Sequence, residues 1–257
     1  MAPLIINADD FGMGPAVNRG VVEAFQRGFC SSATLMATLP GFEEACELIH
    51  REKLANCVGL HLVLRDGVPL TEPIRRLPRF CDAEGRFILA RRGPLPILYF
   101  SGPERHALAA EIRAQINRCR RGEIPLTHLD SHYDLHTEWA VAGVVLQVVR
   151  EEKIPYVRIA RNFGPHLNVV KRLYKAALNR RLVRAGAART RLFGSVRDYQ
   201  TLRQPPEAAD WMEIMIHPRF CPDGVLRDDS NQQPLEASVQ CIQGYQEAVS
   251  FGGHRWR

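Results

Sequence analysis

The sequence predicts an α/β fold in which strands and helices alternate around a closed or nearly closed barrel of parallel strands. Short apolar runs alternate with amphipathic, helix-like stretches along most of the chain, and six or seven such units can be counted. This alternation is typical of β-α units and a parallel sheet. The length of 257 residues and the hydrophobic content of 46% suit one α/β barrel. We therefore expect residues 1–257 to form a single domain.

Three strands and two helices are expected before residue 65. A strand in "PLIINADDF" leads into a helix that begins at "PAVNRGVV", where Val17, Val21 and Phe25 lie at helical spacing and Gly28 marks the end. The next segments are a strand in "SSATLMATL", a helix in "GFEEACELIHREK" and a strand in "CVGLHLVL". This order gives two β-α units and the first strand of a third.

Residues 65–100 interrupt this rhythm. Gly, Pro and Arg are frequent there and no clear periodicity is present, which is typical of a long loop. We expect a loop or lid inserted into the domain, with a short hairpin near Phe80–Phe87.

The alternation resumes at "PERHALAAEIRAQINRCRRG", a helix with Pro103 in its first turn. The next strand is expected in "THLDSHYDLH" (residues 127–136) and the next helix in "EWAVAGVVLQVVREEK". The last elements are a strand in "PYVRIA", a basic helix at 167–185, strands in "RLFGS" and "WMEIMIHP", and a helix near 234–248.

The segment "THLDSHYDLH" has an ionisable or metal-ligating side chain at every second position, namely His128, Asp130, His132, Asp134 and His136. In an extended strand, side chains two residues apart lie on one face, about 6.7 Å from each other. A row of unpaired polar groups facing a core would be costly. The pattern therefore predicts that part of this row faces a polar site.

Other candidate groups lie at the carboxyl ends of predicted strands, where a parallel β/α fold forms its active site. They are Asp9 and Asp10 after "LIINA", His61 in "GLHL", His132 in "DSH" and His217 in "IMIHP". Adjacent carboxylates on an extended segment point to opposite faces, so one can bind a metal while the other transfers protons. One carboxylate and two histidines from different strands form a three-ligand hydrolytic metal site. A further histidine at the same mouth can donate a proton.

Each of these residues also has an ordinary structural interpretation. The acidic pair can cap the following helix, His61 can be a hydrogen-bonded core histidine, and His217 can belong to a turn before Pro218. The whole set can form a buried hydrogen-bond network without a metal. The recurrence of such residues at several strand ends favours the metal site.

The composition limits the class of protein. The seven cysteines are odd in number and widely spaced, with no C-x-x-C pair, which argues against a disulfide framework and a zinc finger. We expect no signal peptide, because "MAPLIINADD" has no basic n-region or small-residue cleavage site. No apolar run reaches the about 20 residues that a membrane span needs. We therefore expect a reduced, cytoplasmic protein.

The net charge of +6 is concentrated in one segment, because residues 171–197 contain nine basic residues and no acidic one. One interpretation is a core-packed helix with a solvated basic side. The other is peripheral contact of residues 168–191 with anionic lipid at the inner face of a membrane. Nucleic acid is disfavoured because the segment lacks interleaved aromatic residues for base stacking. The apolar residues expected to share one face of this helix are Val169, Val170, Leu173, Ala176, Ala177 and Leu182.

Four motifs, in this order and at this spacing, carry a resemblance to a known family: "LIINADDFGMGPAVNRGVVEAFQRG", "VGLHLVLRDGVPLT", "THLDSHYDLH" and "EIMIHP". The chain resembles the YdjC-like carbohydrate deacetylases from residue 4 to about residue 250, and within them the hopanoid-biosynthesis-associated branch. The resemblance implies a distorted (β/α) TIM-like barrel with one divalent metal ion, Mg²⁺ or Zn²⁺. It also implies removal of an acetyl group from an N-acetylated sugar, such as an N-acetylglucosamine oligosaccharide.

The resemblance further implies a role for each candidate residue. Asp10, His61 and His132 would bind the metal, Asp9 would be the general base and His217 the general acid. The residues expected to contact substrate or to orient the ligands are His128, Asp130, His136 and Arg158.

The chain departs from the family pattern at Tyr133 and Asp134, where some relatives have histidines, so the pocket wall and substrate preference can differ. The expected partner is an N-acetylated sugar or a glycolipid such as an N-acetylglucosaminyl hopanoid, and a homodimer is possible. Two other classes compete: a barrel that binds sugar or lipid without turnover, and a non-haem Fe(II) oxygenase, which also uses two histidines and one carboxylate. The strand–helix alternation argues against the oxygenase, and the intact acid–histidine set argues against a binding barrel.

Overall fold

Among the described residues, six strands form a sheet in which every neighbouring pair is parallel. This computed structural model describes residues 3–90, 96–165, 168–202 and 211–253. The strand order is β4-β3-β2-β1-β6-β5. The strands are β1 (Leu4–Phe11), β2 (Ser32–Leu35), β3 (Val58–Leu62), β4 (Leu129–Ser131), β5 (Leu192–Ser195) and β6 (Met212–Ile216).

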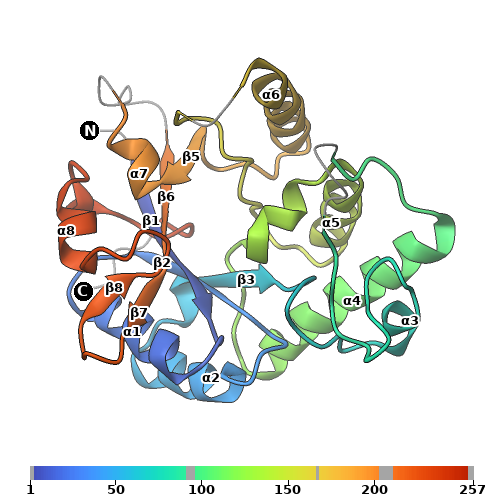
Figure 1. Cartoon of the computed structure of the whole chain (residues 1–257), viewed down its shortest axis with the longest axis horizontal. Helices are drawn as coiled ribbons and strands as arrows, with labels where there is room; N and C mark the ends of the chain where they lie inside the picture. Colours follow the sequence, from blue (N-terminus) through green and yellow to red (C-terminus); the bar gives the residue numbers. More distant parts are fainter. Residues whose placement is uncertain (1–2, 91–95, 166–167, 203–210, 254–257) are drawn as a thin grey trace.

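The sheet curls until its two edge regions are linked. A parallel bridge joins Leu129 to Val157 beside β4, and the Asn162 N–H donates to the carbonyl of Phe193 in β5 over 3.2 Å. The strand predicted in residues 155–160 is thus reduced to one bridge, but its segment still connects β4 to β5. The predicted α/β barrel fold is confirmed as a curled, partly closed barrel (Figure 1).

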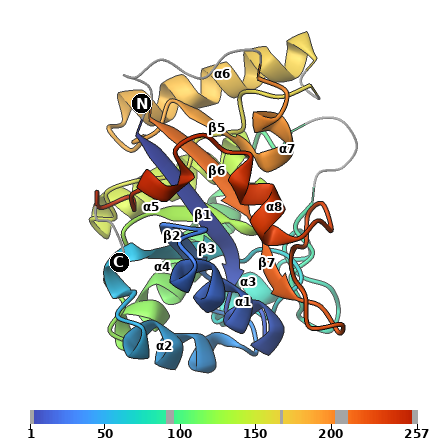
Figure 2. The ribbon, with the colours of Figure 1, turned by 90° about the vertical axis from the view of Figure 1, so that its left-hand side faces the viewer.

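Helices cover the outside of the curled sheet, and the long helices follow the predicted segments. They are α1 (Pro15–Gln26), α2 (Phe42–Arg51), α4 (Gly102–Arg121), α5 (Trp139–Glu151) and α6 (Val169–Arg184). Figure 2 shows β1 beside β6 in the middle of the molecule, with α6 on the side away from α1 and α2. Among the described residues, no helix combines the length and the apolar character that crossing a bilayer requires.

Shorter elements complete the described chain. The helix predicted near 234–248 is wrong in its extent, because α8 ends at Gln240 and a 3₁₀ turn follows Gly244, whose φ of +78° is not helical. The remaining elements are α3 (Glu72–Arg75), α7 (Val196–Tyr199), α8 (Leu235–Gln240), the antiparallel strands β7 (Pro218–Phe220) and β8 (Leu226–Asp228), and the 3₁₀ turns η1 (Ala55–Cys57), η2 (His132–Thr137) and η3 (Tyr245–Glu247).

The long loop at residues 65–100 is anchored to the core. An antiparallel bridge between Cys81 and Phe87 forms the predicted hairpin, and Ile74, Phe80 and Phe87 are buried. Residues 91–95 lie outside the described residues. That this loop acts as a lid stays a prediction.

The sheet is buried on both faces, which explains why its strands read as apolar runs. Every residue of β2 and β3 is buried, and within β1 only Asp10 is partly exposed. Asp10 lies near the carboxyl end of β1, so this one exposed position marks the mouth of the barrel.

The helix α6 packs differently from the sequence-based expectation. Val169, Val170 and Leu173 were expected to share a face with Leu182, but they are 72%, 75% and 67% exposed. Only Leu178 and Leu182 are buried in this helix. The buried contacts lie in its C-terminal half, so the apolar residues of its first turns face solvent.

Candidate active site

The two acids after "LIINA" face the same cavity because β1 is irregular at its end. The pairing of β1 with β2 shifts register between Ala8 and Phe11, and Asp10 adopts a φ of +68°. Aspartate tolerates this left-handed conformation better than most residues. Strict alternation is therefore lost, and Asp9 and Asp10 line one cavity instead of pointing to opposite faces as the sequence predicted.

Three side chains from three different strand ends converge at the mouth. The Asp10 Oδ1 atom lies 3.2 Å from His61 Nε2 and 3.0 Å from His132 Nδ1. One ligand atom from each residue lies within 4.8 Å of the other two. Ligand atoms bound about 2.1 Å from one metal ion are separated by about 3 Å or slightly more. The spacing of these three residues therefore fits a metal-ligand set.

The charge and the free oxygen of the Asp10 carboxylate also suit a bound cation. Its Oδ1 atom is buried and, although both imidazole rings face it, makes no well-aligned hydrogen bond within the described part of the chain. Burial raises the pKa of Asp10, but the neighbouring His132 and His61 outweigh burial and hold that pKa well below its usual value. An ionised carboxylate oxygen with an unused lone pair is what a divalent ion requires.

The orientation of the His61 ring is fixed by contacts to its Nδ1 atom. Its Nδ1 atom lies 2.7 Å from Asp130 Oδ1 and 3.1 Å from Thr34 Oγ1, which leaves Nε2 directed at Asp10. Such a carboxylate–histidine pair sets the ring tautomer of a metal ligand. Burial lowers the pKa of His61, but the charges of Asp130 and Asp10 raise it well above 6.5. Metal binding would therefore displace a proton from this ring.

Arg158 is completely buried and pairs with three carboxyl groups below the cavity. Its two Nη atoms lie 2.7 Å from the two Asp9 oxygens, and one of them also lies 2.7 Å from Asp130 Oδ2. Its Nε atom lies 2.6 Å from Glu213 Oε1. Burial raises the pKa of Glu213 to about 8, although Arg158 opposes this. Of the three carboxyl groups around Arg158, Glu213 is thus the one that burial most favours in its neutral form.

Two further polar side chains, which the sequence did not indicate, hold these groups in place. The Asn7 amide donates to Asp9 Oδ1 over 2.9 Å and to Thr34 Oγ1 over 3.1 Å. The Thr34 hydroxyl lies 3.1 Å from Asp130 Oδ2 and can donate to it. Glu213 was also missed, although a charged residue inside the apolar run "WMEIMI" was an available signal for a buried ion pair.

His217 follows β6 and stands beside the acidic pair. Its Nε2 atom lies 3.9 Å from Asp9 Oδ2, and its Nδ1 atom lies 3.8 Å from Asp228 Oδ1. Burial lowers the pKa of His217, but the charges of Asp9, Asp10 and Asp228 raise it above 6.5. The neighbouring carboxylates therefore favour the protonated ring, which can donate its proton within the cavity.

The row of polar residues in "THLDSHYDLH" is extended only in its first half. β4 ends at Ser131, and the chain turns through η2 with Tyr133 and Asp134 at φ of +57° and +55°. His132 is the first residue of this turn, so His132, Asp134 and His136 lie beyond the end of the strand. A five-residue row on one face, as the sequence predicted, is not formed.

His128 and His136 do not reach the three candidate ligands. The His128 ring stacks on Phe251 with ring centroids 3.8 Å apart, and burial lowers its pKa to about 3, so it is neutral. The His136 Nδ1 atom lies 2.7 Å from Ser131 Oγ, and its Nε2 atom lies 3.0 Å from the carbonyl oxygen of Arg158. These contacts stabilise the backbone around the site.

The cavity above the three candidate ligands is small, with a volume of about 260 Å³. Tyr133 forms an exposed part of its wall, next to the ring of His132 at a centroid distance of 4.2 Å. The Arg65 guanidinium lies 4.9 Å from the centre of the Tyr133 ring. Tyr133 therefore connects the cavity to the loop at 65–100. The cavity is lined by Asp9, Asp10, His61, Ser131, His132, Tyr133, Asp134, Met215, His217, Asp229 and Ser230.

Known proteins with similar sequences include carbohydrate and chitooligosaccharide deacetylases. A carbohydrate deacetylase from Brevibacillus brevis is 36% identical over 230 residues, which cover 88% of this chain and 85% of that protein. A carbohydrate deacetylase from Geobacillus stearothermophilus is 37% identical over 63% of this chain and 61% of its own length. A chitooligosaccharide deacetylase from Yersinia pestis is 34% identical over 62% of this chain and 60% of its own length.

A solved structure and a family model cover nearly the whole chain. The crystal structure of a protein assigned to cellobiose-phosphate cleavage, from Enterococcus faecalis, superposes with a TM-score of 0.67. It covers 100% of this chain and 97% of its own, and at 23% identity it shows the fold alone. The model of the YdjC-like protein family matches residues 3–249. The chain therefore belongs to the YdjC-like protein family.

Proposed function

We propose that the protein is a metal-dependent hydrolase that removes the acetyl group from an N-acetylated sugar. The observation that carries this proposal is the convergence of Asp10, His61 and His132 beside the Asp9–His217 pair in one cavity. Relatives named carbohydrate deacetylase and chitooligosaccharide deacetylase support the same chemistry.

The three converging residues suit one divalent ion, Mg²⁺ or Zn²⁺. Such an ion supplies Lewis acidity, which polarises an acyl oxygen and lowers the pKa of water towards about 7. Asp130 would act on the site through His61, because it fixes the ring that presents Nε2.

Asp9 and His217 would move the protons of the reaction. Asp9 accepts a proton from the water that attacks the acetyl carbon, and Arg158 and Asn7 hold its carboxylate in position. His217 gives its proton to the sugar nitrogen as the C–N bond breaks, so that acetate and a free amine leave. General acid–base assistance of this kind contributes about 10²–10⁴ in rate.

The substrate must present its acetamido group to a narrow site. The cavity volume of about 260 Å³ lies just below the about 300–1,000 Å³ typical of small-molecule pockets. It therefore suits one acetamido group and part of one sugar ring, with the rest of the substrate outside. Chitin-like oligosaccharides meet this requirement.

A lipid-linked N-acetylated sugar, such as an N-acetylglucosaminyl hopanoid, is a second candidate substrate. The observation that favours it is the exposed apolar start of α6, at Val169, Val170 and Leu173. The Tyr174 hydroxyl donates to the carbonyl of Thr137, at the end of the turn that begins with His132. An apolar surface thus lies near the turn that leads to the cavity.

Acetate release tests the proposal. The protein is stripped with a chelator, reloaded with Mg²⁺, Zn²⁺ or Co²⁺, and incubated with N-acetylglucosamine, chitooligosaccharides and an N-acetylglucosaminyl glycolipid. We expect acetate only after reloading and none from His132→Ala. Sugar binding without acetate from any of these substrates would instead support a non-catalytic binding barrel.

A further inference from the structure

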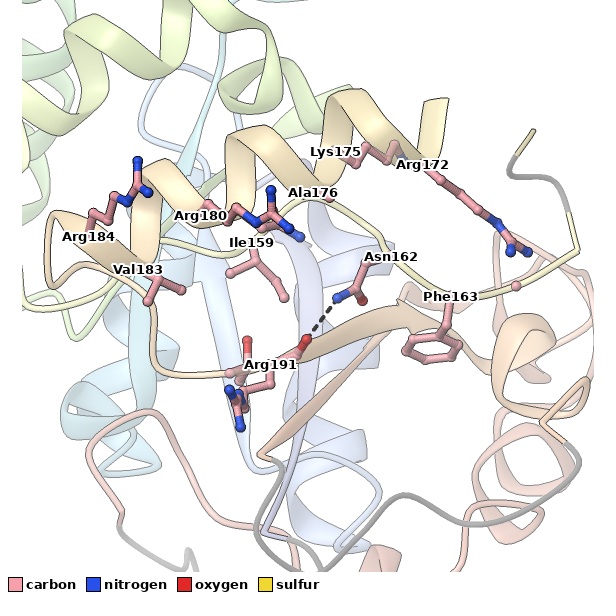
Figure 3. A pocket seen from close by; sticks show the side chains of 13 residues that line it. Ile159, Asn162, Phe163, Arg172, Lys175, Ala176, Arg180, Val183, Arg184 and Arg191 are labelled. Carbon is pink, nitrogen blue, oxygen red and sulfur yellow. Dashed lines mark hydrogen bonds between the residues drawn. The ribbon is translucent and has the colours of Figure 1, made fainter. Parts of the chain in front are cut away.

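A large cavity beside α6 is strongly cationic. It has a volume of about 900 Å³ and lies between α6 and the segments around residues 159–164 and 190–191. Among the described residues, no Asp or Glu lines it. Its five basic residues are Arg172, Lys175, Arg180, Arg184 and Arg191 (Figure 3).

Three of these cations have no anionic partner among the residues that the structure describes. Arg172, Arg180 and Arg184 are exposed, and within the described part of the chain their guanidinium groups make no ion pair or hydrogen bond. By contrast, Arg181 on the same helix donates to the carbonyl of Trp139 over 3.2 Å and packs against its ring. Like charges gathered around one cavity repel one another, so a bound anion would stabilise this arrangement.

The cavity also offers apolar surface. Ile159, Phe163 and Val183 line it together with the arginines (Figure 3). Beyond its end, Val169, Val170 and Leu173 project from the first turns of α6 and are 67–75% exposed. A site that joins guanidinium groups to exposed aliphatic side chains matches a ligand with an anionic head and an apolar body.

The apolar residues lie at the same end of the barrel as the candidate active site. A helix that follows a strand in a β/α barrel begins at the carboxyl edge of the sheet, where the active site lies. Tyr174 confirms this placement, because its hydroxyl donates over 3.0 Å to the carbonyl of Thr137 in η2.

We infer that α6 and the cationic cavity form a docking surface for a membrane of anionic phospholipid. The headgroup phosphates pair with Arg172, Arg180 and Arg184, while Val169, Val170 and Leu173 enter the interfacial layer. A helix of this kind binds through buried apolar area together with attraction to anionic lipid. Docking in this orientation would lay α6 along the membrane, with the start of the helix, at the mouth end of the barrel, in contact with it.

Vesicle co-sedimentation tests this inference without using turnover, so its failure can be told apart from failure of the proposed deacetylation. The whole chain is mixed with vesicles of phosphatidylcholine alone or with phosphatidylglycerol, at low and high salt. We expect binding to the anionic vesicles only, and weaker binding at high salt.

Matched variants locate the surface. Each basic residue near an anionic membrane contributes about fivefold to binding, so a triple Arg→Gln variant at Arg172, Arg180 and Arg184 should bind roughly a hundredfold more weakly. A control triple Arg→Gln variant just after α1 and at the ends of α2 and α4, away from α6, loses the same charge and should bind like the wild type. The control positions are Arg27, Arg51 and Arg121.

A second variant tests the apolar contribution. Val169→Ser, Val170→Ser and Leu173→Ser together should weaken binding to anionic vesicles and leave thermal unfolding unchanged, because these side chains are exposed. The inference is overturned if the wild type binds no vesicle, or if the arginine triple variant binds like the control. Binding of inorganic phosphate or of an RNA oligonucleotide without vesicle binding would also overturn it.

Discussion

Asp130 is the residue that links the two halves of the candidate site. It accepts from His61 on one side and pairs with Arg158 on the other, and Arg158 in turn holds Asp9. One buried carboxylate therefore orients both a metal ligand and the general base.

Replacing Asp130 tests this link. In Asp130→Asn the His61 ring loses its anionic acceptor, and we expect metal affinity to fall by about 10–100-fold, as is usual when the partner of a ligating histidine is removed. Titration calorimetry with Zn²⁺ measures the change. Asp134→Asn is the matched control, since Asp134 lines the cavity outside this network, and it should bind the ion like the wild type. If Asp130→Asn binds Zn²⁺ as tightly as the wild type, Asp130 does not position His61 for metal binding.

The proton held by His217 makes activity depend on pH. Burial lowers its pKa, but Asp9, Asp10 and Asp228 raise it above 6.5. A general acid must be protonated, so kcat/KM should be retained below this raised pKa and should fall as pH rises through it. His217→Asn should lower the rate and remove this alkaline decline. If kcat/KM of His217→Asn still falls as pH rises, the decline belongs to another group.

Among single residues, the sequence correctly located site residues at strand ends but missed those inside the sheet. Asp9, Asp10, His61, His132 and His217 were placed near one mouth, because the carboxyl ends of parallel strands meet at one edge. Asn7, Thr34 and Glu213 were missed, because the partner of a buried polar side chain depends on strand register. The sequence predicted that the strand with His128 continues to His136, but it ends at Ser131. Nothing in the sequence indicated the turn at Tyr133.

At the scale of elements, the close approach of β3 to β4 brings His61 to Asp130. Leu60 and His61 pair with Leu129 and Asp130 in parallel register. Gly59 permits this approach, because a Cβ atom there would lie 2.5 Å from the Nδ1 atom of His128.

A methyl group at Gly59 should therefore disturb the site. Gly59→Ala would place its Cβ atom 2.6 Å from the His128 carbonyl oxygen, and we expect a destabilisation of about 1–3 kcal/mol from overpacking. Denaturant unfolding measures the loss. Gly102→Ala is the control, since no atom lies within 4 Å of its Cβ position, and it should stay within about 0.5 kcal/mol of the wild type. Equal stability of the two variants would contradict the close approach.

The elements also show where periodicity gives incomplete information. The long helices α1, α2, α4 and α5 lie where the sequence placed them, because helical spacing is strong over ten or more residues. The same spacing suggested a buried apolar face for α6, but only Leu178 and Leu182 are buried. Leu182 lies about 140° around the helix from Val169, so these residues do not share a face and the predicted single apolar face was wrong.

At the scale of the whole molecule, the curled sheet assembles the site from four separate strand ends. β1, β3, β4 and β6 bring Asp10, His61, His132 and His217 to one cavity. The ligands are far apart in sequence, so ion binding joins distant parts of the chain and should stabilise the fold as a unit.

Removal of the ion should therefore lower the melting temperature. An ion at 100 times its Kd stabilises the folded state by about 2.7 kcal/mol, which corresponds to roughly 5–10 °C for a domain of this size. Differential scanning calorimetry with Zn²⁺ and with chelator measures the shift. His132→Ala should abolish the shift, and His106→Ala, on an exposed part of α4, should retain it. A shift that persists in His132→Ala would place the ion elsewhere.

The most direct test of the account is a comparison of Asp9→Asn with the wild type, in which bound metal and acetate release are measured on the same samples. Asp9 lies outside the three candidate ligands, so we expect the variant to bind one ion like the wild type. Its turnover of N-acetylated sugar should fall by about 10²–10⁴, because the general base is lost. Acetate release at the wild-type rate from metal-loaded Asp9→Asn would contradict the central claim.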